Sequence, residues 1–109
     1  MPVPLYQVKA ELFKTLGHPL RVRVLELLCE GPKQVRELLT LMEVEAPNLS
    51  QQLAVLRRAG LVAARREGTT VVYELAGADV SVMMRAARAF LTELLADQRE
   101  LLAELEQSA

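Results

Sequence analysis

The sequence predicts a mainly α-helical domain with one small β-hairpin, and three observations carry this prediction. Apolar residues recur at helical spacing over most of the 109 residues. Between residues 61 and 75 the spacing changes to that of short strands. Aromatic residues make up only 4% of the composition, so aliphatic side chains must fill the core. The length predicts a single domain over residues 1–109.

Four helices are predicted before the hairpin. Gly17-His18-Pro19 and Gly31-Pro32 interrupt the helical pattern, and residues 44–46 form a tight connection. Proline suits the first turn of a helix because its missing N–H costs nothing there, so Pro19 and Pro47 mark helix starts. The four helices are expected over residues 5–16, 19–30, 35–42 and 47–59.

The hairpin and one long helix complete the chain. Two strands are expected over residues 61–66 and 70–75, joined by a turn at Glu67-Gly68-Thr69. Val71, Tyr73 and Leu75 share one face of the second strand. After Gly77 the helical period returns and predicts a last helix over residues 78–106. The predicted order is therefore α-α-α-α-β-β-α.

The fourth predicted helix has an apolar inner stripe and a polar outer face. Leu49, Leu53 and Leu56 point the same way, into the protein. At 100° per residue, Gln51 and Arg58 lie opposite them. A DNA major groove accepts one α-helix, and amide side chains bond to adenine in pairs. The alternative interpretation of this face is a solvated helix surface with no partner.

The neighbouring segments favour DNA binding. Residues 34–59 have the form of a helix-turn-helix, whose second helix reads the major groove. The hairpin over residues 61–75 forms a wing beside it, and a protruding basic hairpin reaches phosphates or the neighbouring minor groove. An ordinary surface hairpin is the alternative for the wing alone. Together, the two features predict a winged helix-turn-helix that binds double-stranded DNA.

The chain resembles the ArsR/SmtB family of small bacterial transcriptional repressors over residues 6–105. The matching motifs are LFKTLGHPLRVRVLELL, residues 12–28, and NLSQQLAVLRRAGLVAARREGTTVVYEL, residues 48–75. The resemblance implies a homodimer that binds an inverted-repeat operator near a promoter. The family often has Ser-x-His-Leu where this chain has Ser50-Gln51-Gln52-Leu53. We expect this departure to alter base preference rather than DNA binding.

The recognition helix and the wing together supply the predicted DNA-binding residues. These are Pro47, Asn48, Ser50, Gln51, Gln52, Arg57, Arg58, Arg65, Arg66, Thr69 and Thr70.

The last helix predicts a dimer, because it carries two adjacent apolar stripes and one domain can cover only one of them. A two-fold dimer would set two recognition helices one DNA turn, ~34 Å, apart. The resemblance implies dimerisation through the first and last helices, residues 5–16 and 78–106. The alternative is a single thick core around the last helix. The predicted interface residues are Leu5, Val8, Leu12, Met83, Ala87, Phe90, Leu94, Leu101 and Leu105.

The charge is separated along the chain. The formal net charge of −1 excludes a uniformly basic nucleic-acid binder. Residues 47–70 nevertheless carry four arginines and one acid, whereas residues 76–109 carry three arginines and six acids. A single cysteine excludes an intrachain disulfide. Neither a signal peptide nor a membrane span is visible, which predicts a cytoplasmic protein.

Both metal sites that the resemblance suggests lack their usual ligands. Gln34 and Arg36 occupy the positions of a Cys-x-Cys pair in the third helix. At the other site Asp79 matches, but Ser81 and Thr92 replace histidines, and a lone carboxylate holds a transition metal poorly. We therefore predict no metal and no cofactor.

Two further residues with ligand chemistry favour structural roles. His18 precedes Pro19 at a helix start, where a local structural role is expected. Cys29 is expected on the core side of the second helix, as a buried and inert thiol. The inducing signal stays open between a small organic ligand, a nonstandard metal site and a protein partner.

The sequence thus predicts a sequence-specific DNA-binding transcriptional regulator, a homodimeric repressor. The alternatives are a winged-helix module for protein interaction, and a regulator that needs a partner protein or a small-molecule effector. No catalytic constellation is visible, since the chain has one histidine, one cysteine and no glycine-rich phosphate loop, so an enzyme is not expected.

Overall fold

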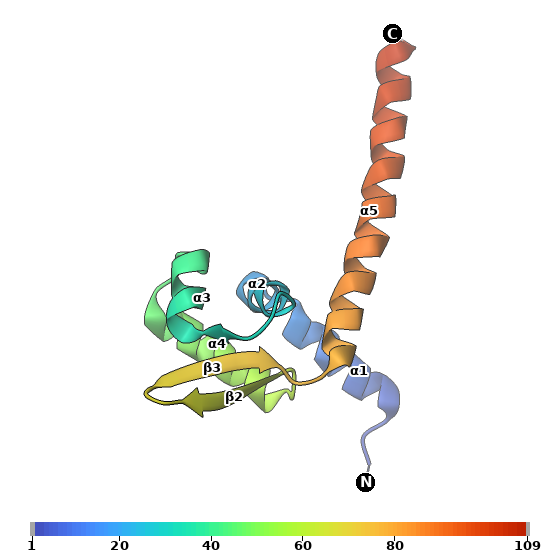
Figure 1. The fold of residues 1–109 in the computed structure, drawn as a ribbon. Coiled ribbons are helices and arrows are strands. Elements are labelled where there is room, and N and C mark those ends of the chain that lie inside the picture. The colour runs from blue at the N-terminus through green and yellow to red at the C-terminus, as the bar shows by residue number, and fades with distance from the viewer. Residues whose placement is uncertain (1, 109) are drawn as a thin grey trace.

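The computed structural model describes residues 2–108 and confirms the mainly helical fold with a small hairpin (Figure 1). The order of the elements differs from the predicted order at one point only, because a short extra strand precedes the third helix. The elements are α1 (Leu5–Leu16), α2 (Pro19–Leu28), β1 (Lys33–Gln34), α3 (Val35–Met42), α4 (Ala46–Arg58), β2 (Val62–Glu67), β3 (Thr70–Leu75) and α5 (Ala78–Gln107).

The extra strand β1 turns the hairpin into a three-stranded antiparallel sheet with β3 in the centre. Lys33 pairs with Tyr73 and Gln34 pairs with Val72. Two residues are too few to produce an alternating pattern, so this strand could not be predicted from the sequence. Its pairing ties the start of α3 to the wing.

Local capping fixes the helix starts. His18 Nδ1 accepts a hydrogen bond from the backbone N–H of Leu20 at 3.2 Å, and Pro19 occupies the first turn of α2. This contact is the local structural role expected of His18. At the start of α3 the backbone N–H of Gln34 donates to Glu37 Oε1 at 2.9 Å. Both bonds satisfy groups that the helix itself leaves unpaired.

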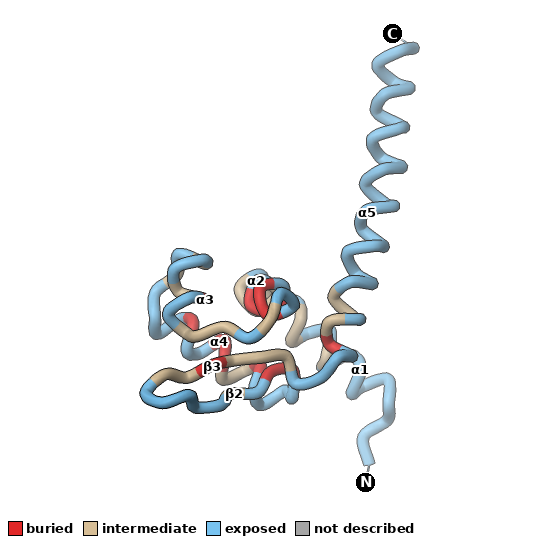
Figure 2. Tube along the Cα trace, in the orientation of Figure 1, coloured by how far each residue is buried: buried red, intermediate tan, exposed pale blue. Residues whose placement is uncertain are grey.

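The core forms where α2, α3, α4 and the first turn of α5 meet. Its residues are Val24, Leu25, Leu27, Leu28, Leu38, Leu49, Leu53, Leu56, Leu61, Val62 and Val80. Val24, Leu25, Leu38 and Leu56 have no exposed surface. In Figure 2 the buried segments lie on α2 and on the elements next to it, whereas α5 beyond its first turns is exposed. The core therefore holds the recognition helix α4 but not most of α5.

Helix α5 projects away from this core and gives the molecule extents of 62 × 44 × 24 Å (Figure 1). Only Val80 of α5 is buried among the described residues, while Met83 and Met84 pack against the core from its edge. Phe90 is 67% exposed and Leu101 is 60% exposed. The alternative of one thick core around the last helix is therefore wrong.

Candidate nucleic-acid interface

The turn between α3 and α4 is short and strained at one residue. Glu43 ends α3 in the left-handed region, with φ 53° and ψ 45°, and its N–H donates to the carbonyl of Leu39 at 3.0 Å. Helix α4 then begins at Ala46, with Pro47 in its first turn. This tight connection fixes the angle at which α4 leaves α3.

Helix α4 presents a polar outer face, as predicted. Leu49, Leu53 and Leu56 are buried in the core. Six of the seven predicted contacts on α4 are exposed, and Ala54 and Val55 between them are half-buried. The six are Pro47, Asn48, Ser50, Gln51, Arg57 and Arg58. The outer face can therefore approach a partner closely.

Gln52 is the exception, and its prediction as a DNA contact is wrong. Its side chain is only 6% exposed. Its Oε1 accepts a hydrogen bond from Arg21 Nε at 2.9 Å, and its Nε2 donates to Asn48 Oδ1 at 3.2 Å. At 100° per residue Gln52 lies next to the buried stripe of Leu49, Leu53 and Leu56, and Arg21 of α2 packs against it there.

Arg21 of α2 is the residue that sequence reasoning missed. It is half-buried and also donates from Nη1 to the carbonyl of Thr15 at 3.3 Å. Arg21 is one of two arginines in α2, and no local pattern distinguishes it from the exposed Arg23. Its partner Gln52 lies 31 residues further along the chain, a separation that no local pattern spans.

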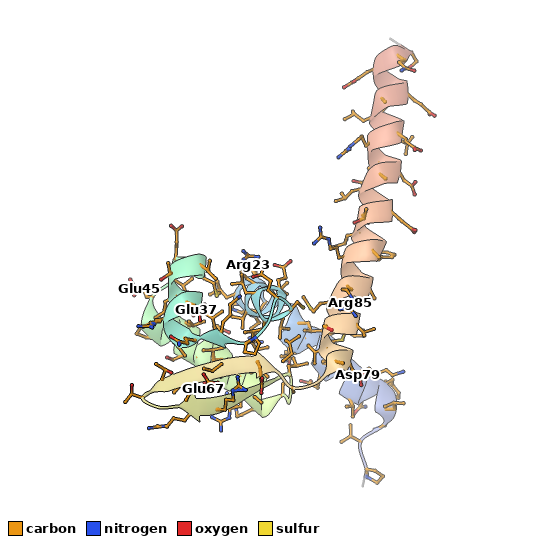
Figure 3. All side chains as sticks on the ribbon, viewed as in Figure 1. Arg23, Glu37, Glu45, Glu67, Asp79 and Arg85 are labelled. Atoms are coloured by element: carbon orange, nitrogen blue, oxygen red, sulfur yellow. The ribbon has the colours of Figure 1, made fainter. Side chains whose placement is uncertain are left out.

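The wing turns tightly at Gly68, whose φ of 62° suits glycine. Thr70 Oγ1 donates to the carbonyl of Glu67 at 2.7 Å and closes the turn. Arg65, Arg66 and Thr69 are exposed, and Thr70 is half-buried. Glu67 lies beside this turn in Figure 3. The wing thus presents most of its predicted contacts to solvent.

The two wing arginines lie on opposite faces of β2, because successive side chains alternate along a strand. Arg66 pairs with Val71 and shares the face of Val62, which belongs to the core. Arg65 lies on the other face, where its guanidinium contacts Glu67 at 3.1 Å and Glu74 at 3.5 Å. Two carboxylates therefore offset the charge of Arg65, and no ion pair of Arg66 is found within residues 2–108.

Cys29 is exposed, so its predicted burial is wrong. Helix α2 ends at Leu28, which leaves Cys29 beyond the core-facing stripe. Cys29 lines an open depression of about 310 Å³ with Pro32, Leu75 and Ser81 among its neighbours. Desolvation raises the pKa of the Cys29 thiol above its ordinary value, and the positive charge of Arg85 opposes that rise.

The positions of the two family metal sites hold other contacts. Arg36 Nε donates to Gln34 Oε1 at 2.8 Å, and Arg85 Nη1 donates to Ser81 Oγ at 3.2 Å. Figure 3 shows Arg85 and Asp79 on the first turns of α5. Within residues 2–108 no three His, Cys, Asp or Glu side chains gather closely enough to hold a metal ion. In the same range no helix combines the length and the apolar character that a membrane crossing needs.

A helix-turn-helix with a wing and a polar outer face on its second helix defines a DNA-binding transcriptional regulator. Residues 18–64 match the model of the bacterial regulatory proteins of the arsR family. An uncharacterized HTH-type transcriptional regulator of Mycobacterium tuberculosis, Rv0081, is 50% identical over 103 residues, covering 94% of this chain and 90% of the relative. The chain belongs to the arsR family, which is a family of regulators and not of enzymes.

Solved structures and a named repressor extend the comparison. The crystal structure of Rv0081 superposes with a TM-score of 0.83 at 51% identity, covering 89% of this chain and 98% of that chain. The homodimeric winged helix-turn-helix domain of Mb0332 from Mycobacterium bovis gives a TM-score of 0.78 at 33% identity, covering 84% of each chain. The biofilm growth-associated repressor of Agrobacterium fabrum is 41% identical over 80 residues, covering 70% of this chain and 68% of the repressor.

Proposed function

We propose that the protein is a homodimeric repressor that binds an inverted-repeat operator in double-stranded DNA. The observation that carries this proposal is the polar outer face of α4, held rigidly by its three buried leucines beside a basic wing. A bacterial regulator that acts on chromosomal DNA works in the cytoplasm. The relative in Agrobacterium fabrum is named a repressor, which supports the direction of control.

The exposed apolar residues of α1 and α5 support the dimer. Leu5, Val8, Phe90 and Leu105 are each more than half exposed. On α5 the apolar residues recur at helical spacing, and a long exposed apolar stripe is unusual on a monomer. A second copy that pairs α1 and α5 with their own counterparts would cover it. Leu12 and Met83 pack partly on their own core, so they would join the two regions. The homodimeric state of Mb0332 supports a dimer.

The predicted DNA contacts divide into two kinds by position. The first turns of α4 carry Asn48, Ser50 and Gln51, which would read base edges in the major groove. The end of α4 and the wing carry Arg57, Arg58 and Arg66, which would bind phosphates. Pro47, Thr69 and Thr70 would lie beside the backbone, and Arg65 would contribute less because carboxylates already hold it.

Release from DNA would not use the usual metal sites of the family. At one site the side chains of Arg36 and Gln34 form a hydrogen bond with each other. At the other site the guanidinium group of Arg85 donates a hydrogen bond to Ser81. A guanidinium group at a ligand position repels a metal ion. The proposed repressor would therefore not respond to a metal ion through either of these two sites.

Selection from a library of randomised 30-base-pair duplexes tests this function. We expect the wild-type chain to enrich an inverted repeat. Gln51→Ala should change which bases are enriched, because a base contact carries sequence information. Replacing Arg65 and Arg66 together with alanine should lower affinity on every duplex. Arg99→Ala, at the far end of α5, is the matched control and should change neither. Enrichment of no sequence by the wild type would refute the proposal.

A further inference from the structure

A chain of hydrogen bonds joins three helices behind the outer face of α4. It starts at the carbonyl of Thr15 in α1, passes through Arg21 in α2 and Gln52 in α4, and ends at Asn48 in the first turn of α4. Gln52 is the only buried polar side chain within residues 2–108. A buried amide needs its partners, so these bonds hold Gln52 in one position.

The direction of every bond in this chain follows from the arginine. A guanidinium group has no acceptor, so Arg21 must donate and the atom of Gln52 that faces it must be Oε1. The other branch of that amide is then the donor Nε2, and it must meet an acceptor on Asn48, which is Oδ1. Arg21 thus fixes the orientation of an amide that it does not touch.

This orientation decides what Asn48 offers to a partner. Its Oδ1 is turned to Gln52 inside the protein, so its Nδ2 donor forms the opposite branch of the same amide. Asn48 is exposed in the first turn of the recognition helix. Bidentate pairing with adenine needs both branches of an amide in one orientation, and here the bond from Gln52 already uses one lone pair of Oδ1 and turns that branch toward Gln52.

We propose that Arg21 and Gln52 are positioning residues that act through Asn48 and make it a hydrogen-bond donor toward DNA. Asn48 then selects base edges that present acceptors in the major groove, such as guanine N7 and O6 or thymine O4, and rejects the amino group of cytosine. This proposal rests on the proposed function, because it concerns the same recognition helix. The competing role is a purely structural link between α2 and α4.

Gln52→Glu separates the two roles. A glutamate still accepts from Arg21, but it cannot donate to Asn48, so the last bond is lost in its present direction and can form only if the Asn48 amide reverses. The probes are the duplex selected by the wild-type chain and its single-base-pair variants, measured by fluorescence anisotropy. For one base pair of each half-site, we expect the ratio of the affinities for the selected duplex and its variant to fall about tenfold. This factor corresponds to one good base contact. Discrimination at the other base pairs should not change.

A double-mutant cycle tests whether Gln52 acts through Asn48. In the Asn48→Ala background Gln52→Glu should no longer alter base discrimination. Gln51→Glu, which adds the same charge at the neighbouring exposed position, is the matched control, and its effect should persist in that background. The proposal would be overturned if Gln52→Glu still altered base discrimination in the Asn48→Ala background. It would also be overturned if Gln52→Glu lowered the affinity for every duplex by the same factor.

Variants of Arg21 give a second test, which still applies if the Gln52→Glu variant does not fold. Lysine is also only a donor, so Arg21→Lys should keep the wild-type base preference. Glutamine both donates and accepts, so Arg21→Gln should broaden the preference at the same base pair. Equal base preferences in these two variants would overturn the proposal. If the wild type enriches no sequence, the proposed function and this inference fail together; if it enriches one, only the inference is at stake.

Discussion

Arg65 and Arg66 are adjacent in the sequence but have different surroundings in the structure. The sequence predicted one basic pair on the wing. The register of β2 places the two side chains on opposite faces, and Glu67 and Glu74 contact only Arg65. Glu74 is nine residues from Arg65, so its effect depends on strand pairing that a charge count does not show. Of the two wing arginines, Arg66 is therefore the one without an ion pair among residues 2–108 and available to a phosphate.

Single alanine substitutions should separate the two arginines. We expect Arg66→Ala to weaken binding to all duplexes and to lower the slope of log affinity against log salt by about one per lost phosphate contact. Arg65→Ala should have a smaller effect, since its carboxylate partners already offset its charge. Anisotropy titrations at several salt concentrations measure both slopes. Equal slopes for the two variants would contradict this difference.

Cys29 shows how a helix that ends two residues earlier than predicted changes a residue's environment. The sequence pattern ran to Glu30 and buried the thiol, whereas α2 ends at Leu28 and exposes it. The periodicity of apolar residues cannot place a helix end to within one or two residues. Gly31-Pro32 shows only that the helix must end before it.

The alkylation rate of Cys29 should follow its raised pKa. Only the thiolate reacts, so a higher pKa leaves less thiolate at a given pH and slows the reaction with iodoacetamide. We expect the pH at which alkylation reaches half its maximum rate to be higher for Cys29 than for the thiol of glutathione. Arg85→Ala should move it higher still, because Arg85 lowers the pKa. A midpoint below that of glutathione would contradict this assignment.

At the scale of elements, periodicity predicted the helices and their faces well. The bounds of α1 and α3, and the buried stripe of α4, match the sequence pattern because the apolar spacing reflects burial directly. Two features could not be predicted from this periodicity. Strand β1 is too short to have a period, and the bond between Arg21 and Gln52 joins helices that are distant in the sequence.

The turn between α3 and α4 offers a test of stability. Glu43 has a φ of 53°, which costs a residue with a side chain free energy that glycine avoids. We expect Glu43→Gly to raise the free energy of unfolding by about 0.5–1 kcal/mol. Urea denaturation at fixed protein concentration measures it. Glu45→Gly is the control, since Glu45 has a φ of −75° and gains nothing from glycine; equal effects of both variants would refute this reasoning.

At the scale of the whole molecule, α5 decides how the domain assembles. Its two apolar stripes were visible in the sequence, and the structure shows that the domain itself covers only the first turns (Figure 2). The sequence alone did not decide between a thick core and a dimer, because both bury the same leucines. The direction in which α5 leaves the sheet excludes the thick core.

Charges placed in the stripe should break the proposed dimer. We expect Leu94→Glu with Leu101→Glu to give a monomer in sedimentation analysis, because each glutamate would be buried without a partner. Such a monomer should bind the selected duplex far more weakly than the wild type. Ala96→Glu with Ala103→Glu is the matched control, since helical geometry puts the same two charges on the opposite side of α5. Dimers from both variants would contradict the proposed interface.

The projecting half of α5 links folding to protein concentration. A long helix without packing frays in water, because tertiary contacts supply most helical stability. In dilute samples the amide hydrogens of residues 90–107 should therefore exchange with solvent faster than those of α2, and concentrating the sample should slow them. The C-terminal segment would then become ordered only once two copies have met, so the amount of regulator in a cell would itself set how much of it is fully folded.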